Sequence, residues 1–441
     1  MLKSNIAWMK KNVPSDLKVW KGMIQDIDWS QVAAKTKLSL QRDKDRITAE
    51  FKEFAAMDTS AKIDWLMNGD RHLGYLYKKD AIAFARREWK GLKSVGYDFV
   101  GWLKIWGGML NMVMKDPMSI MLAVFEYHWF ASYLATPAVV DRSVFGRRGK
   151  LLQADFDMWV AITHWAEDLI ANLIMADAKI GGNQKINKRI IMFDEMTMAQ
   201  MMAGFPNLLG IPYQMIPVFM VSEMDQLTLI PYIDAIESYG LPSDTCPLPT
   251  AECGCAVKDE YPMCGQGFIA SSMPCDGSVM ATSFQDRRFS KFMPSYPLCM
   301  PVRYDDEDTT EMAAADMKDC IHWVEGLTGE TWNWDTYFAT MEKMNECTRL
   351  EMEKWEINKT HYPQLVGSSF ELFRKWNYEM DGGLFPEGLK TQRKICKTMM
   401  ETYEKKLPAY VGGYEKYRAL IWSCPAHFYA NFSNWLANCW G

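Results

Sequence analysis

Short apolar runs that alternate with helical segments constrain the fold of this 441-residue chain more than any other feature. The runs follow the pair Gly181-Gly182 and cover residues 189–193, 216–221, 268–272 and 298–302. Runs this short and this apolar are typical of strands that are buried on both faces of a parallel sheet. The sequence therefore predicts an α/β fold with Rossmann-like or flavodoxin-like parallel-sheet lobes.

The residues before the double glycine predict a large helical N-terminal region. From Leu152 to Leu173, apolar residues recur at steps of three and four, which places them on one face of a helix that Gly181-Gly182 ends. His164 lies on this helix, and we expect it to be structural because no second histidine stands at metal-ligand spacing.

Changes in the pattern of apolar residues, glycines and cysteines divide the chain into four segments. We expect a helical N-terminal region over 1–185, a first Rossmann-like lobe with a cysteine cluster over 186–330, a helical connector over 331–412, and the start of a second Rossmann-like lobe over 413–441. The last segment offers one strand, at 418–423, and one helix. A single strand cannot complete a parallel sheet, so the second lobe looks incomplete within these residues.

Composition narrows the class of protein. A net charge of −6 with 49% hydrophobic residues indicates a globular protein and argues against nucleic-acid binding. The stretch from Met1 to Gly22 carries lysines throughout, so it does not resemble a signal peptide. The apolar stretches 118–140 and 196–222 are interrupted by charged residues or by glycine and proline, so we expect no membrane span and a cytoplasmic protein.

Cysteines are concentrated in one part of the chain. None of the eleven occurs before position 246, and five then follow in close succession: Cys246, Cys253, Cys255, Cys264 and Cys275. Three interpretations stay open, namely a zinc site, unligated thiols and an iron–sulfur cluster. The spacing lacks the paired C-x-x-C motifs that structural zinc sites prefer. Cysteines on loops can bind an iron–sulfur cluster without a fixed spacing, which favours the cluster.

Two of these cysteines follow segments that end at one edge of the predicted sheet. Cys275 follows the apolar run 268–272, and Cys246 follows the loop that begins at Gly240. Ligands of parallel sheets gather at the carboxyl ends of the strands, so we expect both thiols at one rim. The chain has no Walker motif, no glycine-rich dinucleotide motif and no serine-hydrolase elbow, so any use of ATP would belong to a partner protein.

Three short stretches, at 240–246, 271–277 and 420–425, resemble the 2-hydroxyacyl-CoA dehydratase and benzoyl-CoA reductase family. The resemblance covers roughly residues 186 to 441. It implies two Rossmann-like lobes with a [4Fe-4S] cluster held between them by three cysteines. Cys246 and Cys275 match the first two ligand positions. Cys424 is the nearest substitute for the third, which in the family lies further along the second lobe, and Cys439 is a poorer substitute.

The resemblance also implies the chemistry. Family members accept an electron from a separate ATP-hydrolysing iron–sulfur activator, pair with a related second subunit, and deliver the electron to a CoA thioester, so that a ketyl radical expels the 2-hydroxyl as water is eliminated. The expected function is thus an anaerobic radical (R)-2-hydroxyacyl-CoA dehydratase subunit, with a benzoyl-CoA reductase-type subunit or a noncatalytic partner subunit as alternatives. Glu195 follows the first predicted strand, where it would act as an acid or base, although a solvated carboxylate at a helix start is the more ordinary interpretation.

Overall fold

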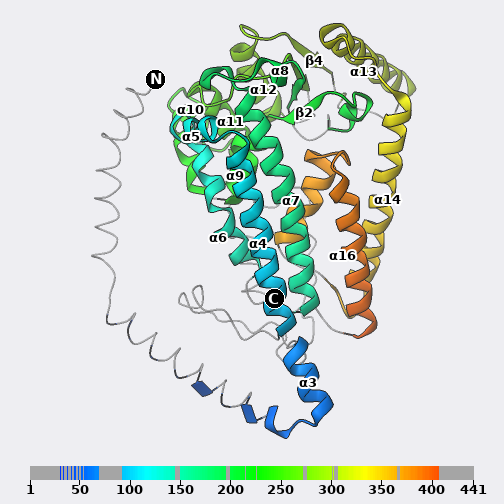
Figure 1. The fold of residues 1–441 in the computed structure, drawn as a ribbon. Coiled ribbons are helices and arrows are strands. Elements are labelled where there is room, and N and C mark those ends of the chain that lie inside the picture. Colours follow the sequence, from blue (N-terminus) through cyan, green and yellow to red (C-terminus); the bar gives the residue numbers. More distant parts are fainter. Residues whose placement is uncertain are drawn as a thin grey trace.

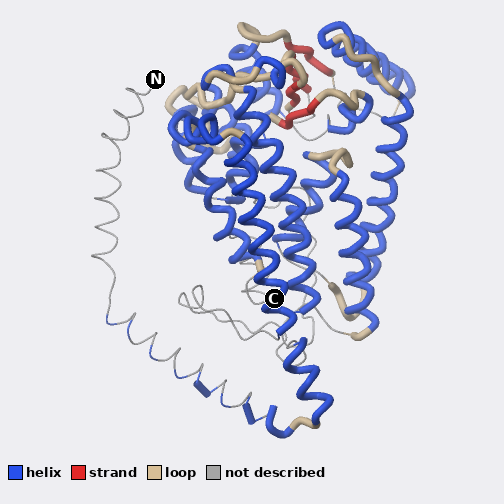
Figure 2. Tube along the Cα trace, in the orientation of Figure 1, coloured by secondary structure: helices blue, strands red, loops and turns tan. Residues whose placement is uncertain are grey.

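The computed structural model describes residues 92–406 apart from short gaps at 145–148, 195–198, 214, 225, 272–275, 300, 302–305 and 365–367. It also describes residues 51–68 except 53, and scattered positions between 30 and 48. Figures 1 and 2 show a mostly helical molecule with a small sheet at one end, from which long helices extend. This arrangement confirms the predicted α/β fold with a large helical region.

Four parallel strands form the sheet, in the order β2-β1-β3-β4. Their bounds are β1 Ile190–Phe193, β2 Leu209–Pro212, β3 Gly267–Ser271 and β4 Ser295–Leu298. The central strands β1 and β3 pair directly, with Met192 opposite Phe268, and every residue of both is buried. Burial on both faces explains why these two strands are continuous apolar runs in the sequence.

Helices account for most of the remaining described residues. Before the sheet lie α3 Thr59–Asn68, α4 Leu92–Lys115, α5 Pro117–Glu126, η2 Trp129–Ala135, α6 Thr136–Ser143, α7 Gly149–Ala176, η3 Ala178–Ile180 and α8 Gln184–Asn187. Between the strands lie η4 Ala199–Gly204, η5 Met215–Met220, α9 Val221–Met224, η6 Gln226–Leu229, α10 Ile230–Glu237, α11 Pro247–Val257 and α12 Asp276–Phe289. After the sheet lie α13 Glu307–Thr328, α14 Trp334–Asn358, α15 Ser368–Lys375, η7 Trp376–Met380 and α16 Pro386–Glu404.

The helix expected at 152–173 occurs where the sequence predicts it. Helix α7 begins at Gly149, buries Trp159 and Leu173, and ends at Ala176, before the expected stop; Gly181, in the left-handed conformation with φ 87°, instead caps the short η3. The acidic run at 305–308 contains the N-cap of α13, because the Asp306 carboxylate accepts a hydrogen bond from Thr309 N at 2.6 Å. His164 lies 3.3 Å from Glu387 Oε2 on α16, which is consistent with a structural role.

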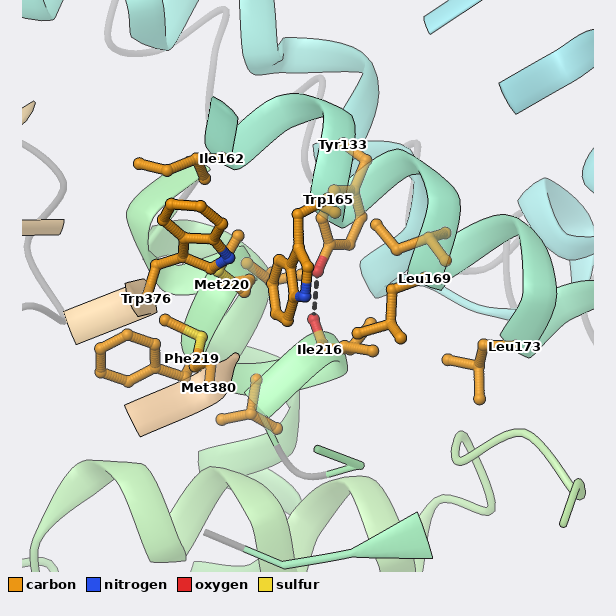
Figure 3. Close-up of a cluster of buried hydrophobic side chains, with 14 of the residues drawn as sticks. Tyr133, Ile162, Trp165, Leu169, Leu173, Ile216, Phe219, Met220, Trp376 and Met380 are labelled. Atoms are coloured by element: carbon orange, nitrogen blue, oxygen red, sulfur yellow. Dashed lines mark hydrogen bonds between the residues drawn. The ribbon is translucent and has the colours of Figure 1, made fainter. Parts of the chain in front are cut away.

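The predicted strand at 216–221 is wrong. These residues form the π-helix η5 and the start of α9, and the neighbouring strand β2 comes from the proline- and glycine-rich stretch before them. Figure 3 shows the reason: Ile216, Phe219 and Met220 are surrounded by side chains of α7 and η7, and Tyr133 Oη donates to Ile216 O at 2.5 Å. Burial on all sides gives a helix the same apolar run as a strand, so periodicity does not separate them.

Two further strand predictions have different outcomes. The run predicted at 298–302 is shifted, because β4 occupies Ser295–Leu298 and ends where the prediction begins. The strand predicted at 418–423, and with it the second lobe, lies outside the described residues. Among the described helices, none has the length and apolar character needed to cross a membrane.

Candidate functional site

The carboxyl edge of the sheet contains a topological switch point between β1 and β3. The chain leaves β1 toward β2 on one side and leaves β3 toward β4 on the other, since the strand order is β2-β1-β3-β4. Loops that leave neighbouring parallel strands in opposite directions open a crevice, and open α/β sheets bind their ligands there. The residues that follow Phe193 and Ser271 therefore border the candidate site.

Asp194 joins the two strand ends at this switch point. It is 1% exposed, and its carboxylate accepts hydrogen bonds from Ser271 N at 2.5 Å, from Ser271 Oγ at 2.8 Å and from Thr282 Oγ1 at 3.1 Å. Thr282 lies on α12, so a single carboxylate connects the end of β1, the end of β3 and the helix that follows β3. A buried carboxylate needs such partners, and here they fix the geometry of the edge.

Burial divides the cysteine cluster into two kinds of thiol. Cys253, Cys255 and Cys264 are at most 1% exposed, and burial raises the pKa of Cys253 to about 12 and the pKa values of the other two well above the usual range. Such thiols stay protonated and pack as small apolar side chains. Cys246 is exposed and is the N-cap residue of α11.

Helices α11 and α12 run parallel to each other, which places Cys246 at the carboxyl edge of the sheet. Their carboxyl ends are adjacent, because Arg288 forms an ion pair with Asp259, and Gln285 Nε2 donates to Tyr261 Oη at 3.0 Å. Helix α12 begins shortly after β3 ends, so its amino end lies at the carboxyl edge. The amino end of α11, with Cys246, lies at that edge too.

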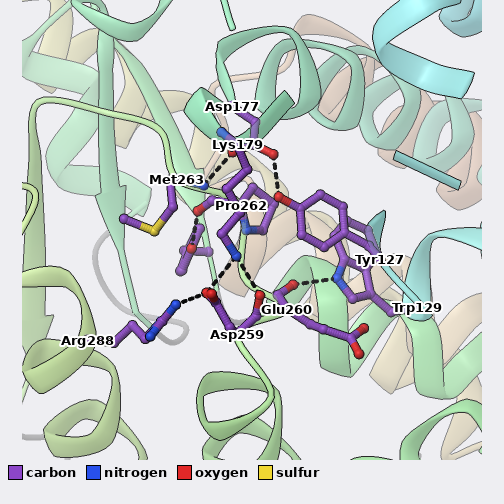
Figure 4. A network of polar contacts seen from close by, with 10 residues as sticks. Tyr127, Trp129, Asp177, Lys179, Asp259, Glu260, Pro262, Met263 and Arg288 are labelled. Carbon is purple, nitrogen blue, oxygen red and sulfur yellow. Dashed lines mark hydrogen bonds and ion pairs between the residues drawn. The ribbon is translucent and has the colours of Figure 1, made fainter. Parts of the chain in front are cut away.

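A close contact with α10 and a polar network hold α11 in place. A Cβ atom at Gly254 would stand 1.9 Å from Tyr232 O, so only glycine lets α11 approach α10 this closely. Beyond the carboxyl end of α11, Lys179 Nζ donates to Asp259 Oδ1 at 2.7 Å, and Asp177 accepts a hydrogen bond from Met263 N at the same distance (Figure 4).

Asp177 anchors this network to the helical region. It is fully buried and also accepts hydrogen bonds from Tyr127 Oη and from Lys179 N, and burial raises the pKa of its carboxyl. Trp129 Nε1 donates to Glu260 O at 2.8 Å beside it, as Figure 4 shows. The helical region therefore supports the loop that leads from α11 into β3.

Of the predicted site residues, the structure places Cys246. Glu195, Cys275, Cys424 and Cys439 lie outside the described residues. Within the described part of the chain, no three His, Cys, Asp or Glu side chains gather closely enough to hold a metal ion. Sequence reasoning missed Asp194 as a determinant of the site. The available signal was a polar residue directly after a fully apolar strand, since such residues border the ligand crevice of parallel sheets.

The fold and the carboxyl edge of the sheet thus define an α/β protein with a candidate ligand site at a switch point. Comparison with known families shows which family it is similar to. Residues 226–441 match the family model described as 2-hydroxyglutaryl-CoA dehydratase, D-component. This match, over slightly less than half of the chain, supports the resemblance to the 2-hydroxyacyl-CoA dehydratase family. The description as a D-component implies a partner subunit. No curated protein matches the chain.

Proposed function

We propose that the chain is the iron–sulfur subunit of an ATP-activator-dependent radical (R)-2-hydroxyacyl-CoA dehydratase, with a [4Fe-4S] cluster held by Cys246, Cys275 and Cys424. One observation carries the proposal: among the described cysteines of the cluster 246–275, Cys246 alone is exposed, and it lies at the carboxyl edge of the sheet within the region that matches the family.

The packing of α11 on α12 supports a shared site for Cys246 and Cys275. Cys253 packs with Ala281 in one buried cluster, and Asp259 pairs with Arg288, so both contacts align the two helices in nearly the same register. The two helices therefore run side by side in the same direction, with Cys246 at the amino end of α11 and Asp276 at the amino end of α12. Both helices also present partly positive amino ends at this edge, which stabilise negatively charged ligands.

The chain's own residues suit this chemistry. When bound, a cluster with three thiolate ligands supplies one electron and an open iron position for a thioester carbonyl. Cys246 and Cys275 would hold it from one side, and Cys424 from the second lobe. Asp194 keeps the ends of β1 and β3 together through Ser271, which shortly precedes Cys275. Glu195, next to Asp194, would move a proton at the hydroxyl or the 3-position of the substrate.

Anaerobic purification tests the proposal. The full chain is coexpressed with the product of the neighbouring gene as the candidate partner subunit, iron and sulfide are quantified, and the complex is assayed with 2-hydroxyacyl-CoA esters, the activator protein and ATP. We expect about four iron and four sulfide per chain and water elimination that depends on ATP. Reduction of an aromatic acyl-CoA instead would assign the reductase alternative. An iron-free chain in an active complex would assign the noncatalytic alternative.

A further inference from the structure

Helix α4 carries an exposed apolar stripe with a regular repeat. Seven side chains in this helix are 50–65% exposed: Leu92, Val95, Phe99, Leu103, Trp106, Leu110 and Met114. These side chains recur every eleven positions, as in Leu92, Leu103 and Met114. This spacing of eleven positions makes slightly more than three full turns of an α-helix, so the stripe runs nearly straight along α4.

The opposite face of α4 is already used inside the molecule. Gly101, Ile105, Gly108 and Met112 are buried, and this face packs against α7, which lies beside α4 in Figure 1. The exposed stripe is therefore a second apolar face on a helix that the bundle holds rigidly. A helix with apolar residues on both faces is expected to be covered on both.

Two glycines in the stripe follow the same repeat. Gly96 and Gly107 are related by the spacing that relates Leu92 to Leu103, and a Cβ atom at either glycine would meet no other atom within 4 Å. Glycine weakens a helix interior relative to alanine, and no contact among the described residues requires it at these positions. Close approach of another backbone across this face would require it.

Lysines flank the stripe on one side. Lys93, Lys104 and Lys115 again follow the repeat, and Lys115 pairs with Asp168 on α7, which leaves Lys93 and Lys104 exposed at the stripe. The acidic residue of α4, Asp98, is 8% exposed and lies on the other face. The other flank is half-buried, with Trp102 and Val113. The surface is thus apolar with positive charge along one side.

We propose that this α4 face, residues 92–114, binds an apolar helix of the partner subunit that presents a row of carboxylates opposite Lys93 and Lys104. The inference rests on the proposed function only for the existence of a second component. A second copy of this chain offers no exposed carboxylate on α4 to meet the lysines. A membrane surface would favour lysines along both flanks, and α4 has them along one.

The size of the face fits a stable protein interface. Seven side chains exposed by half or more present roughly 800 Å² of apolar surface, taking about 200 Å² for a fully exposed large side chain. That area is close to what one partner contributes to a standard interface and exceeds the largest patch on a typical monomer. The centre of the stripe, at Leu103 and Trp106, is where the binding energy should be concentrated.

Association of the coexpressed complex tests the inference without reference to activity. The probe is the full chain with the product of the neighbouring gene as the candidate partner subunit, and the measurements are light scattering on size exclusion and hydrogen exchange of residues 92–115. We expect a complex in which these residues are protected, and we expect the double variant Leu103→Glu/Leu110→Glu to weaken it at least about 100-fold. Met352→Glu, at a 62% exposed position on α14, is the matched control and should leave the complex intact.

A glycine variant separates docking from folding. Gly107→Leu adds a side chain where the isolated chain has open space, so it should raise the melting temperature of the isolated chain and still weaken the complex about tenfold or more. A complex that forms with residues 92–115 unprotected would overturn the inference. So would self-association of the chain through α4, or binding to anionic vesicles that Leu103→Glu/Leu110→Glu abolishes. Failure of the proposed function would appear separately, as an intact complex without iron.

Discussion

The carboxyl edge of the sheet and the helical layer each bury a carboxyl group, and they treat it in opposite ways. At the edge, Asp194 accepts three hydrogen bonds from Ser271 and Thr282. Between α4 and α7, Glu167 lines a cavity with apolar neighbours such as Met109 and Ile170, and its Oε1 has no hydrogen-bond partner among the described residues. Burial raises the pKa of Glu167 to about 8.

The two sites differ in how a buried carboxyl group is accommodated: by hydrogen-bond donors at the edge, and by protonation in the apolar cavity. A carboxylate that bonds to two strand ends and a helix needs several hydrogen-bond donors around it. A chain supplies these donors where the edge of a sheet must keep a fixed geometry. A carboxyl in an apolar cavity gives up its charge instead. The cysteines show the same division, because Cys246 is exposed at the edge while Cys253, Cys255 and Cys264 are buried and protonated behind it.

The largest effect should come from the exposed thiol at the edge. On the proposed function, Cys246→Ser replaces a soft thiolate ligand with a hydroxyl that binds iron–sulfur clusters poorly, so iron should fall from about four per chain to a small remnant, with the loss of the absorbance near 400 nm. The unfolding midpoint should stay close to that of the unsubstituted chain, since Cys246 is on the surface. Iron quantitation and the visible spectrum of anaerobically purified protein measure the change.

Two matched variants sharpen that result. Cys299→Ser removes an exposed cysteine that follows β4 at the same edge, and it should retain its iron. Cys253→Ala removes a buried thiol from the same helix as Cys246, so it should also retain iron and lose about 1–2 kcal/mol of stability. Equal loss of iron in all three variants would contradict the division between the edge and the interior.

The second effect concerns the carboxylate at the edge. Asp194→Ala leaves the buried Ser271 N–H without its acceptor and removes the side-chain hydrogen bonds between the ends of β1 and β3, so we expect a loss of about 3 kcal/mol in the free energy of unfolding. Iron content should fall partly, because the strand end that precedes Cys275 is released. Denaturant unfolding followed by circular dichroism gives the first quantity. Unchanged stability would show that the edge does not depend on Asp194.

The third effect is a pH dependence in the helical layer. Glu167 ionises near 4.5 in the unfolded chain and near 8 in the folded one, so between these values the folded state holds a proton that the unfolded state releases. Stability from this group is therefore highest below about pH 4.5 and declines as pH rises to about 8. Glu167→Gln should remove the decline and stabilise the protein by about 4 kcal/mol at pH 8, but by less than about 1 kcal/mol at pH 5.

Melting temperatures of both proteins across pH 5 to 8 measure this contrast. Asp194→Asn is the matched control at the edge, because it changes a carboxyl that already has hydrogen-bond partners. It should destabilise the protein at neutral pH, where Glu167→Gln stabilises it. The same sign for both variants would break the comparison between the two regions.

Sequence patterns predict the parts of this fold in which local pattern and burial agree. Strands β1 and β3 and helix α7 follow from apolar runs or from helical spacing. The run 216–221 does not, because its helix is buried on all sides. On α14, the apolar side chains Met352 and Trp355 are exposed by 62% and 48%, since one face of that helix lies away from the core.

The site could be predicted only in part for a related reason. Family motifs point to Cys246, but its distinction from Cys253 and Cys255 depends on tertiary burial, because residues 248–256 of α11 are all buried while Cys246 at its amino end is exposed. The contact between Asp194 and Ser271 joins residues 77 positions apart, and no local pattern encodes such a pair. Strand order decides it, because the sheet places β1 next to β3.

The smallest effect tests how much the hydrogen bond from Thr282 contributes to holding the Asp194 carboxylate at the edge. Thr282→Val keeps the shape of the side chain and removes one of the three hydrogen bonds to Asp194, at 3.1 Å. Two partners on Ser271 remain, so the loss should be about 1 kcal/mol and iron content should not change. Thr282→Ser, which keeps the hydroxyl, should recover most of that stability. A loss as large as that of Asp194→Ala would instead mean that the connection to α12, rather than the pairing of β1 with β3, holds the edge together.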